Sequence, residues 1–266
     1  MKTLIITSNY GRFGNNFIAL LNAIIICLQN NYDRLFFPKI DFLGTREIIF
    51  NITPNTDSNE ECIHISGYDA HVAKEHGHLK YHVNPKEIFD KYLRHHFNIN
   101  QKSPNIYTLY TRADDIFNYD QIMDLYTPAP LYFYDIIMKK ENMEYPLLIS
   151  QDLRNPVAEY LVKNNLVKWN QQNFNDDIIE LVNSKILIIG FSTMLYFVIL
   201  YSNTLKKIYM PDFVHQNFLK LKINIKEILR KDQELIIIEI PNYPMQETMK
   251  KMPDLGYSTI LKYQPT

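Results

Sequence analysis

The sequence predicts an α/β fold with parallel sheets and crossover helices. Three observations predict it: strand-like and helix-like segments alternate along the chain, a glycine-bearing loop joins the first strand to the first helix, and 46% of the 266 residues are hydrophobic. Such alternation is typical of βαβ units, whose parallel strands need a helix to connect them. The hydrophobic fraction can bury a core, and the length suits one large domain or two small ones.

The first hundred residues begin with a strand, a glycine loop and a helix. Apolar residues recur at helical spacing over 17–28, directly after the loop. A later helix has a clear start, because Asn84 can cap it, Pro85 suits its first turn and Glu87 follows the cap by three residues. In order, we expect a strand over 1–7, a helix over 17–28, strands at 35–37 and 63–65 around a polar loop over 51–62, and a helix over 84–96.

A polar segment over 98–105 marks the predicted boundary between an N-terminal lobe, 1–103, and a C-terminal lobe, 104–266. The tail either stays with the second lobe or returns to the first. In open parallel sheets, ligands bind outside the carboxyl ends of the strands. Beyond the boundary we expect strands at 107–111, 146–150, 167–169, 186–189, 208–210 and 235–240, and helices at 155–164, 176–183 and 193–201.

Bulk charge and cysteine content exclude some classes of protein. A net charge of −1 and a pI near 6.7 give no overall positive field, so we expect no nucleic-acid partner. Any anionic ligand must then be held locally, by arginines and backbone amides. Cys27 and Cys62 are too few for a disulfide framework, which fits a reducing compartment. Cys27 falls in the apolar helical run, where we expect it to pack as a small hydrophobe.

We expect no membrane span and no secretion signal, and hence a cytoplasmic protein. The apolar run of the first strand is too short for a signal peptide, and no small-residue cleavage site follows it. The longest apolar stretch, Ile186–Tyr201, is shorter than the roughly 20 residues that a spanning helix needs. Because Gly190 and Ser192 interrupt it, a buried strand, a turn and a buried helix explain it better.

The loop after the first strand contains Gly11, Arg12, Gly14, Asn15 and Asn16. Glycine allows the backbone to take positive φ and to approach a ligand, and a helix N-terminus offers free amides to an anion. A tight structural turn would use the same residues. Because the chain has seven glycines in all, two of them three residues apart make this loop a candidate ligand-binding element.

Three later strand ends also carry polar groups. Arg112 directly follows one strand, where its guanidinium can clamp a diphosphate through two hydrogen bonds or pair with a neighbouring aspartate. Asp152 follows a second strand. After a third, Gly190 precedes Ser192 and Thr193, whose hydroxyls open a helix. The last two segments are equally compatible with ordinary helix caps.

Taken in order, these segments resemble a known family. GRFGNN resembles the GRxGNQ loop that opens the fucosyltransferases of the alpha-1,2 and alpha-1,6 type and the protein O-fucosyltransferases. TLYTRADD stands where that superfamily has HxRxGD, and LLISQD resembles its strand ending in Ser-Asp. IIGFSTMLYFVILYS and IYMPDF are similar to its late Ser-Thr motif and the strand that follows. The resemblance extends from residue 3 to residue 213 and depends on the order and spacing of degenerate motifs.

The resemblance implies a GT-B fold, in which two Rossmann-like lobes face a central cleft. A nucleotide-sugar donor, typically GDP-fucose, is then held mainly by the second lobe. Arg112 would contact its β-phosphate, Ser192 and Thr193 its phosphates or ribose, and Asp152 the base or its ribose. The complete donor-binding set implied is Gly11, Arg12, Gly14, Asn15, Asn16, Asp152, Gly190, Ser192 and Thr193, with Arg112.

The sequence departs from the family pattern at the arginine motif. Tyr110 replaces the family's histidine, and Asp114 replaces its glycine. A carboxylate at Asp114 would repel a diphosphate unless it pointed away. In the late motif, Tyr196 and Phe197 stand where the alpha-1,2 group usually has two tryptophans. These departures concern the donor sugar more than the fold.

We expect neither a metal nor a cofactor. Metal-dependent transferases of the other major fold hold Mn²⁺ or Mg²⁺ with two aspartates one residue apart, and Asp-x-Asp does not occur in this sequence. The adjacent Asp176 and Asp177 open a predicted helix, where acids favour the helix dipole. Six histidines lie before the helix predicted over 84–96 or at its end: His71, His76, His78, His82, His95 and His96. A zinc site is one interpretation, but their spacing matches no common pattern of zinc ligands. We interpret them instead as part of a solvated loop on the acceptor side, with His95 and His96 near a helix C-terminus.

The predicted reaction is an inverting transfer of fucose from GDP-fucose to a glycan hydroxyl. Arg112 would stabilise the departing diphosphate, and Asp115 is the nearest candidate for a base that deprotonates the acceptor. Three alternatives stay open: a transferase of the same fold with another nucleotide sugar, a non-catalytic nucleotide- or glycan-binding homologue, and a non-enzymatic α/β scaffold.

Overall fold

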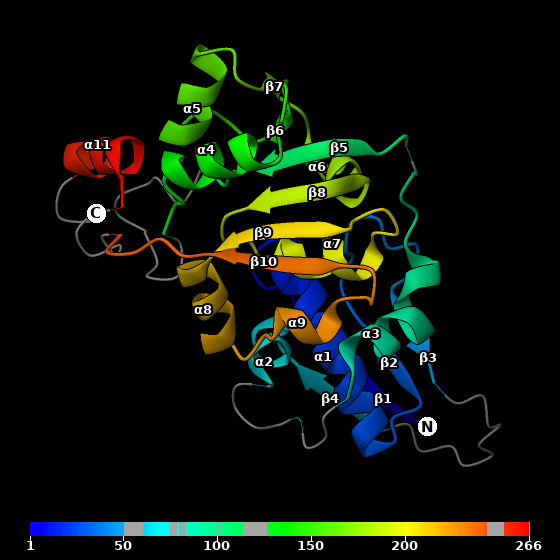
Figure 1. The fold of residues 1–266 in the computed structure, drawn as a ribbon. Helices are drawn as coiled ribbons and strands as arrows, with labels where there is room; N and C mark the ends of the chain where they lie inside the picture. Colours follow the sequence, from blue (N-terminus) through cyan, green and yellow to red (C-terminus); the bar gives the residue numbers. More distant parts are fainter. Residues whose placement is uncertain are drawn as a thin grey trace. The chain divides into compact units, whose positions relative to one another are not determined.

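The computed structural model describes residues 1–50, 61–74, 79, 83–100, 102–113, 127–243 and 253–265. It is an α/β protein, as predicted, with two compact units that each contain a mostly parallel sheet (Figure 1). Unit 1 comprises Met1–Asn100 and Thr193–Tyr201, and unit 2 comprises Gln101–Ser192 and Ser202–Thr266. The helix over 194–201, which the sequence analysis places in the second lobe, therefore groups with the first unit.

Unit 1 has a four-stranded sheet in the order β3-β2-β1-β4. The strands β2 and β4 pair in parallel with opposite sides of β1, and β3 pairs antiparallel with β2. The chain therefore changes its direction of travel across the sheet at β1, between β1 and β4. The elements are β1 (Lys2–Ile6), α1 (Phe13–Asn30), β2 (Arg34–Phe36), β3 (Glu47–Ile49), β4 (Glu61–Ile65), α2 (Gly67–Val72) and α3 (Pro85–Ile88).

An aromatic cluster forms the core of unit 1. The helix α7 (Met194–Tyr201) is apolar on all sides, which predicts a buried helix, and each residue from Met194 to Leu200 is buried. The ring of Phe197 lies 5.0 Å from that of Phe17 and 4.9 Å from that of Phe97. At the end of α7, the Arg94 guanidinium donates hydrogen bonds to the carbonyl oxygens of Leu200 and Tyr201.

The helix predicted over 84–96 begins as expected but is not a single α-helix. Asn84 caps it by accepting a hydrogen bond from the Lys86 amide at 2.9 Å. The α-helix α3 then continues as a π-helical turn, Phe89–Leu93, and a 3₁₀ turn, Arg94–His96. These turns bury Phe89 and Leu93 and turn Arg94 toward the carbonyl end of α7.

Unit 2 has a six-stranded, fully parallel sheet in the order β10-β9-β8-β5-β6-β7. The chain passes outward from β5 to β7 and returns to β8 on the other side of β5, which is the order of a doubly wound, Rossmann-like sheet. Right-handed crossovers place α4 and α5 on one face and α6 on the other (Figure 1). The elements are β5 (Asn105–Tyr110), α4 (Leu131–Lys140), β6 (Leu147–Ile149), α5 (Pro156–Lys163), β7 (Lys168–Trp169), α6 (Phe174–Val182), β8 (Ser184–Ile189), β9 (Lys207–Pro211), α8 (Asp212–Lys220), α9 (Ile225–Ile228), β10 (Glu234–Ile238) and α11 (Pro253–Lys262).

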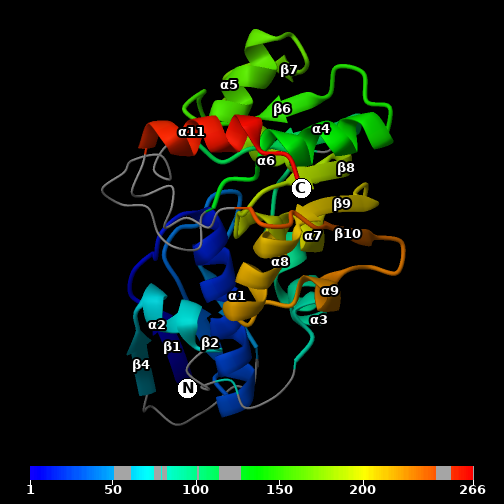
Figure 2. The ribbon, with the colours of Figure 1, turned by 60° about the vertical axis from the view of Figure 1, so that its left-hand side comes forward.

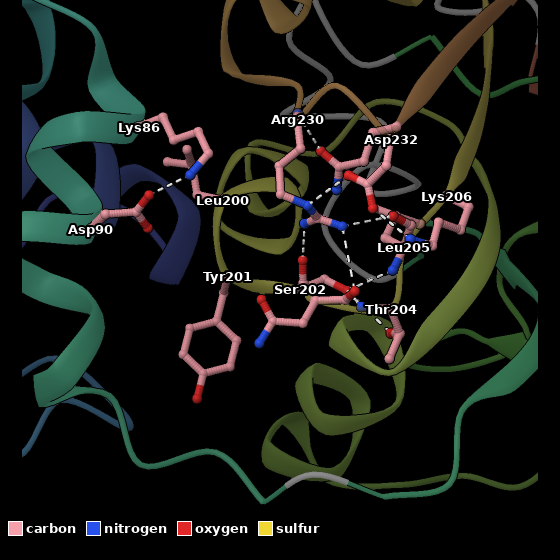
Figure 3. A network of polar contacts seen from close by, with 12 residues as sticks. Lys86, Asp90, Leu200, Tyr201, Ser202, Thr204, Leu205, Lys206, Arg230 and Asp232 are labelled. Carbon is pink, nitrogen blue, oxygen red and sulfur yellow. Dashed lines mark hydrogen bonds and ion pairs between the residues drawn. The ribbon is translucent and has the colours of Figure 1, made fainter.

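Two contacts fix the end of the chain and a connection within unit 2. The C-terminal helix α11 packs against α4 and α5 (Figure 2), so the tail lies with this unit. The segment that leads into β9 is held by Arg230, whose guanidinium donates to the carbonyl oxygens of Ser202 and, at 3.1 Å, of Leu205 (Figure 3). The buried Ser202 hydroxyl donates to the carbonyl oxygen of Val182 at 2.5 Å.

Two apolar segments of the sequence have a clear place in the fold. Ile186–Tyr201 divides into the strand β8, a turn and the helix α7, as predicted. Among the described residues, α1 is long and apolar enough to cross a membrane, and 67% of that stretch is buried inside the structure. Cys27, on α1, is fully buried, and burial raises the pKa of its thiol, which confirms its packing as a small hydrophobe.

Candidate functional site

In the glycine loop of unit 1, Asn15 and Asn16 form hydrogen bonds within the loop and to neighbouring residues. Gly11 takes a φ of 64°, which its lack of a side chain permits. The carbonyl oxygen of Arg12 accepts hydrogen bonds from the amides of Asn15 and Asn16, at 3.0 and 3.1 Å. The side-chain oxygen of Asn16 accepts one from the Tyr10 amide at 2.7 Å. The loop is therefore a well-defined turn at the carboxyl end of β1.

Gly14 lets α1 approach the start of α7. A Cβ atom on Gly14 would lie 2.5 Å from the Met194 nitrogen and 2.6 Å from the Thr193 hydroxyl oxygen. That hydroxyl donates a hydrogen bond to the side-chain oxygen of Asn15 at 2.9 Å. The structure thus brings Gly14, Asn15 and Thr193, three of the predicted donor-binding residues, together inside unit 1 as a packed joint between two helices.

An aromatic group lies beside this loop, where the unit 1 sheet changes direction. The ring of Tyr10 is 5.1 Å from those of Tyr68 and His71. Neither ring nitrogen of His71 has a hydrogen-bond partner among the described residues, and burial lowers the pKa of His71. Asn22 holds the end of α2 by donating to the carbonyl oxygens of Ala70 and His71. His71, which the sequence predicts in a solvated loop, is instead partly buried, with both ring nitrogens shielded from solvent.

At the carboxyl edge of the unit 2 sheet, a pocket with a volume of about 10 Å³, room for about one water molecule, lies at the switch point between β5 and β8. Arg112, two residues after the end of β5, and Gly190, which directly follows β8, both contribute to its wall. Thus two predicted donor-binding residues from distant parts of the sequence meet where doubly wound sheets bind their ligands. The wall consists of Arg112, Thr127, Pro128, Ala129, Tyr134, Asn155, Gly190 and Phe191.

Two buried side chains fix the backbone around Arg112. Asn155 caps α5 by accepting a hydrogen bond from the Val157 amide at 2.9 Å, and its own amide donates to the Arg112 carbonyl oxygen at 2.8 Å. The Tyr134 hydroxyl donates to the Tyr110 carbonyl oxygen at 3.4 Å. Because both side chains are almost fully buried, they hold the end of β5 in a defined position.

Thr111 lies at the same strand end and is 1% exposed. Its amide donates to the Ile149 carbonyl oxygen at 3.0 Å, but its hydroxyl has no hydrogen-bond partner among the described residues. A buried hydroxyl without a partner is costly and needs an explanation, such as a ligand or an ordered water.

The other predicted residues of unit 2 have more local roles. The Asp152 carboxylate accepts hydrogen bonds from the Arg154 amide at 2.9 Å and from the Arg154 guanidinium at 2.5 and 2.8 Å. Ser192 is buried just beyond β8. The proposed base, Asp115, and its neighbour Asp114 lie outside the described residues, as do His76, His78 and His82.

Asp177 lies in the first turn of a helix, as predicted, but its side chain is buried. Asn173 is the N-cap of α6, and the Asp177 side chain in the first turn is 7% exposed. Burial, with the nearby charges of Asp176 and Glu180, raises the pKa of Asp177 to about 7. The helix dipole lowers the pKa of this carboxyl and burial raises it, and burial has the larger effect.

Within the described part of the chain, no group of three His, Cys, Asp or Glu side chains could together hold a metal ion. Comparisons with protein-family models, with curated proteins and with solved structures found no match to this chain. The site must therefore be interpreted from its own geometry.

Sequence reasoning missed part of the pocket wall. The helix α4, which supplies Tyr134, was not predicted, because 131–140 mixes aromatic and polar residues without a clear cap. Asn155 was predicted as a helix start, but nothing local indicates that its amide also binds the Arg112 carbonyl. Thr111 lies inside a predicted strand, and the sequence gives no sign that its hydroxyl is buried without a hydrogen-bond partner among the described residues.

Proposed function

We propose that this chain is a glycosyltransferase that binds the diphosphate of a nucleotide sugar at the carboxyl edge of the unit 2 sheet. The observation that carries this proposal is the position of Arg112 at the switch point between β5 and β8, on the same pocket wall as Gly190. An arginine there can form two parallel hydrogen bonds to phosphate oxygens. The neighbouring residue in the chain, Thr111, has a buried hydroxyl without a hydrogen-bond partner among the described residues, and a ligand could supply that partner.

The proposed reaction needs electrostatic stabilisation of a leaving diphosphate. An acceptor hydroxyl attacks the anomeric carbon from the face opposite the nucleotide, the bond to the diphosphate oxygen breaks, and the configuration inverts. Arg112 and backbone amides neutralise the charge that develops on the diphosphate, so no metal is required. The proposal includes a GT-B fold with GDP-fucose as the first candidate donor, and it rests on the motif resemblance together with the Arg112 site.

A transferase with another nucleotide sugar is the second candidate. At the position of the family's histidine, the ring of Tyr110 is buried at 8% exposure, within β5. A buried phenol is chemically different from the imidazole of the family motif. This difference favours a donor sugar other than fucose, with diphosphate recognition by Arg112 unchanged.

A nucleotide panel tests both candidates. We expect GDP, UDP, CDP or dTDP to raise the melting temperature of the protein, and the one that does so identifies the donor class. Arg112→Gln should abolish that rise and reduce transfer from the matching sugar nucleotide at least tenfold. Lys185→Gln, which removes an exposed positive charge at the amino end of β8, should change neither. Nucleotide binding by Arg112→Gln at the wild-type affinity would disprove the site, and wild-type binding without transfer would favour a non-catalytic homologue.

A further inference from the structure

A groove with a volume of about 610 Å³ lies at the amino-terminal edge of the unit 2 sheet. Because all six strands are parallel, this edge is opposite the one that carries Arg112. The groove is lined by Asn105 and Tyr107 of β5, by the segment before β6 and by residues on both sides of the end of β7. No part of the proposed nucleotide site contributes to it.

The most unusual residue of the groove is Tyr145. Its φ is 49°, in the left-handed region that bulky side chains rarely adopt, and Pro146 follows it. A residue before proline normally has an extended backbone, so this conformation is strained. The side chain is nevertheless 57% exposed, so packing of the ring does not explain the strain. The chain holds an aromatic ring at the groove at a cost in its own backbone energy.

The groove is electrically balanced and rich in amide groups. Glu180 is neutralised by Lys102 at 3.1 Å and by a hydrogen bond from Asn105 at 2.5 Å. The remaining charged lining residues, Glu144 and Lys168, have opposite signs. The side chains of Asn142, Asn170 and Gln172 can each donate and accept hydrogen bonds.

We propose that this groove binds a neutral oligosaccharide, with the Tyr145 ring against a sugar face and the amides on its hydroxyl groups. Each sugar hydroxyl donates and accepts, as each amide does, and the apolar C–H face of a sugar ring suits the face of a tyrosine. When Lys102 is counted with the lining residues, the charges at the groove cancel, which gives no advantage to an anionic or cationic ligand. The site does not depend on the proposed transferase activity and would hold a glycan away from the nucleotide.

The test is a glycan array carrying neutral and sialylated oligosaccharides, followed by a titration with the strongest neutral binder. We expect the intact protein to retain neutral oligosaccharides and Tyr145→Gly to lose at least tenfold in affinity. Glycine takes a φ of 49° without strain, so the melting temperature of this variant should stay equal or rise. A loss of binding without a loss of stability distinguishes a binding residue from a structural one.

Two further variants locate the bound glycan. Tyr160→Ala removes a tyrosine that is 39% exposed on α5 and should leave the affinity unchanged. Arg112→Gln should also leave it unchanged, even if that variant loses nucleotide binding. The proposal is overturned if no neutral oligosaccharide binds, if only sialylated ones bind, if Tyr145→Gly retains full affinity, or if Arg112→Gln abolishes it.

Discussion

At the end of β1, Asn15 and Asn16 of the loop over 11–16 form hydrogen bonds with the loop itself, with Tyr10 and with Thr193. At the end of β5, by contrast, the Thr111 hydroxyl has no hydrogen-bond partner among the described residues. The glycines of the two strand ends, Gly14 and Gly190, differ in the space around them. A Cβ on Gly14 would collide with the backbone of α7, while a Cβ on Gly190 would meet the Tyr134 hydroxyl at an ordinary 3.7 Å.

The comparison shows that similar sequence signals can arise from different physical causes. The unit 1 loop needs its second glycine for close helix packing, which is sufficient to explain the residue without a ligand. The unit 2 strand end has a pocket with an arginine in its wall, and a buried hydroxyl that finds no hydrogen-bond partner within the described ranges. We therefore expect substitutions in unit 1 to change mainly stability and those in unit 2 to change mainly binding.

The largest effect is expected from Gly14→Ala. The added methyl group must displace backbone atoms of Thr193 and Met194, so the free energy of unfolding should fall by about 3 kcal/mol. Urea denaturation measures the loss. Gly190→Ala is the matched control, with an expected change within about 1 kcal/mol. Equal losses in the two variants would remove the distinction between the two glycines.

Asn155→Ala should affect both stability and binding. It removes the cap of α5 and the hydrogen bond from Asn155 to the partly buried Arg112 carbonyl oxygen, which together should cost about 2 kcal/mol. It should also weaken nucleotide binding, because the end of β5 loses a support. Asn173→Ala removes an exposed cap on α6 and should cost about 1 kcal/mol without affecting binding. If Asn155→Ala lost no more stability than Asn173→Ala and kept the wild-type nucleotide affinity, the contact with Arg112 would contribute to neither stability nor binding.

Asp177 in unit 2 and His71 in unit 1 should make the free energy of unfolding depend on pH in opposite directions. The Asp177 pKa of about 7 exceeds its ordinary value near 3.8, so the folded chain keeps a proton that the unfolded chain releases, and stability falls as pH rises across that window. The pKa of His71 is lowered, so the unfolded chain binds a proton there more readily than the folded chain does. The free energy of unfolding therefore falls as pH drops below about 6.5.

Urea denaturation at pH 4 and pH 8 tests this difference. Asp177→Asn should become more stable relative to wild type at pH 8 than at pH 4, by roughly 1–3 kcal/mol. His71→Phe, which keeps an aromatic ring against Tyr10, should gain relative stability at pH 4. The same stability difference from wild type at both pH values would mean that neither group is titrated differently on folding.

The smallest effect on stability is expected from Thr111→Val. The substitution keeps the shape and removes a hydroxyl that has no hydrogen-bond partner in the described part of the chain, so stability should be unchanged or rise by about 0.5–1 kcal/mol. Nucleotide affinity should fall several-fold if the hydroxyl binds the ligand. In Thr108→Val, the lost hydroxyl accepts a hydrogen bond from Ser184 at 2.6 Å, so stability should fall by about 1–2 kcal/mol. Unchanged affinity in Thr111→Val would assign the unpaired hydroxyl to a water site.

The sequence was sufficient for the fold class and for most strands, because buried parallel strands are short apolar runs that end in polar residues. It also located the starts of α3 and α5 through Asn84 and Asn155. It did not predict β3, which pairs at an exposed edge, or the π-helical turn, because tertiary contacts of Phe89 and Arg94 determine that geometry.

For the candidate site, the sequence indicated which strand ends matter but not how their groups are used. Arg112 and Gly190 were predicted together, and the structure puts both on one pocket wall. The ion pair between Asp152 and Arg154 and the contact between Asn15 and Thr193 depend on side-chain conformations that no spacing rule supplies.

The place of α7 in unit 1 has a consequence for synthesis on the ribosome. Unit 1 lacks the Phe197 ring at its centre and the Thr193 hydroxyl beside Gly14 until the chain has grown past residue 201. At roughly 5–20 residues per second, about 5–20 s separate the appearance of Asn100 from that of Tyr201. During this interval the earlier part of the chain, with its exposed phenylalanines, has to avoid aggregation, so a chaperone that binds apolar segments should associate with nascent chains shorter than about 200 residues.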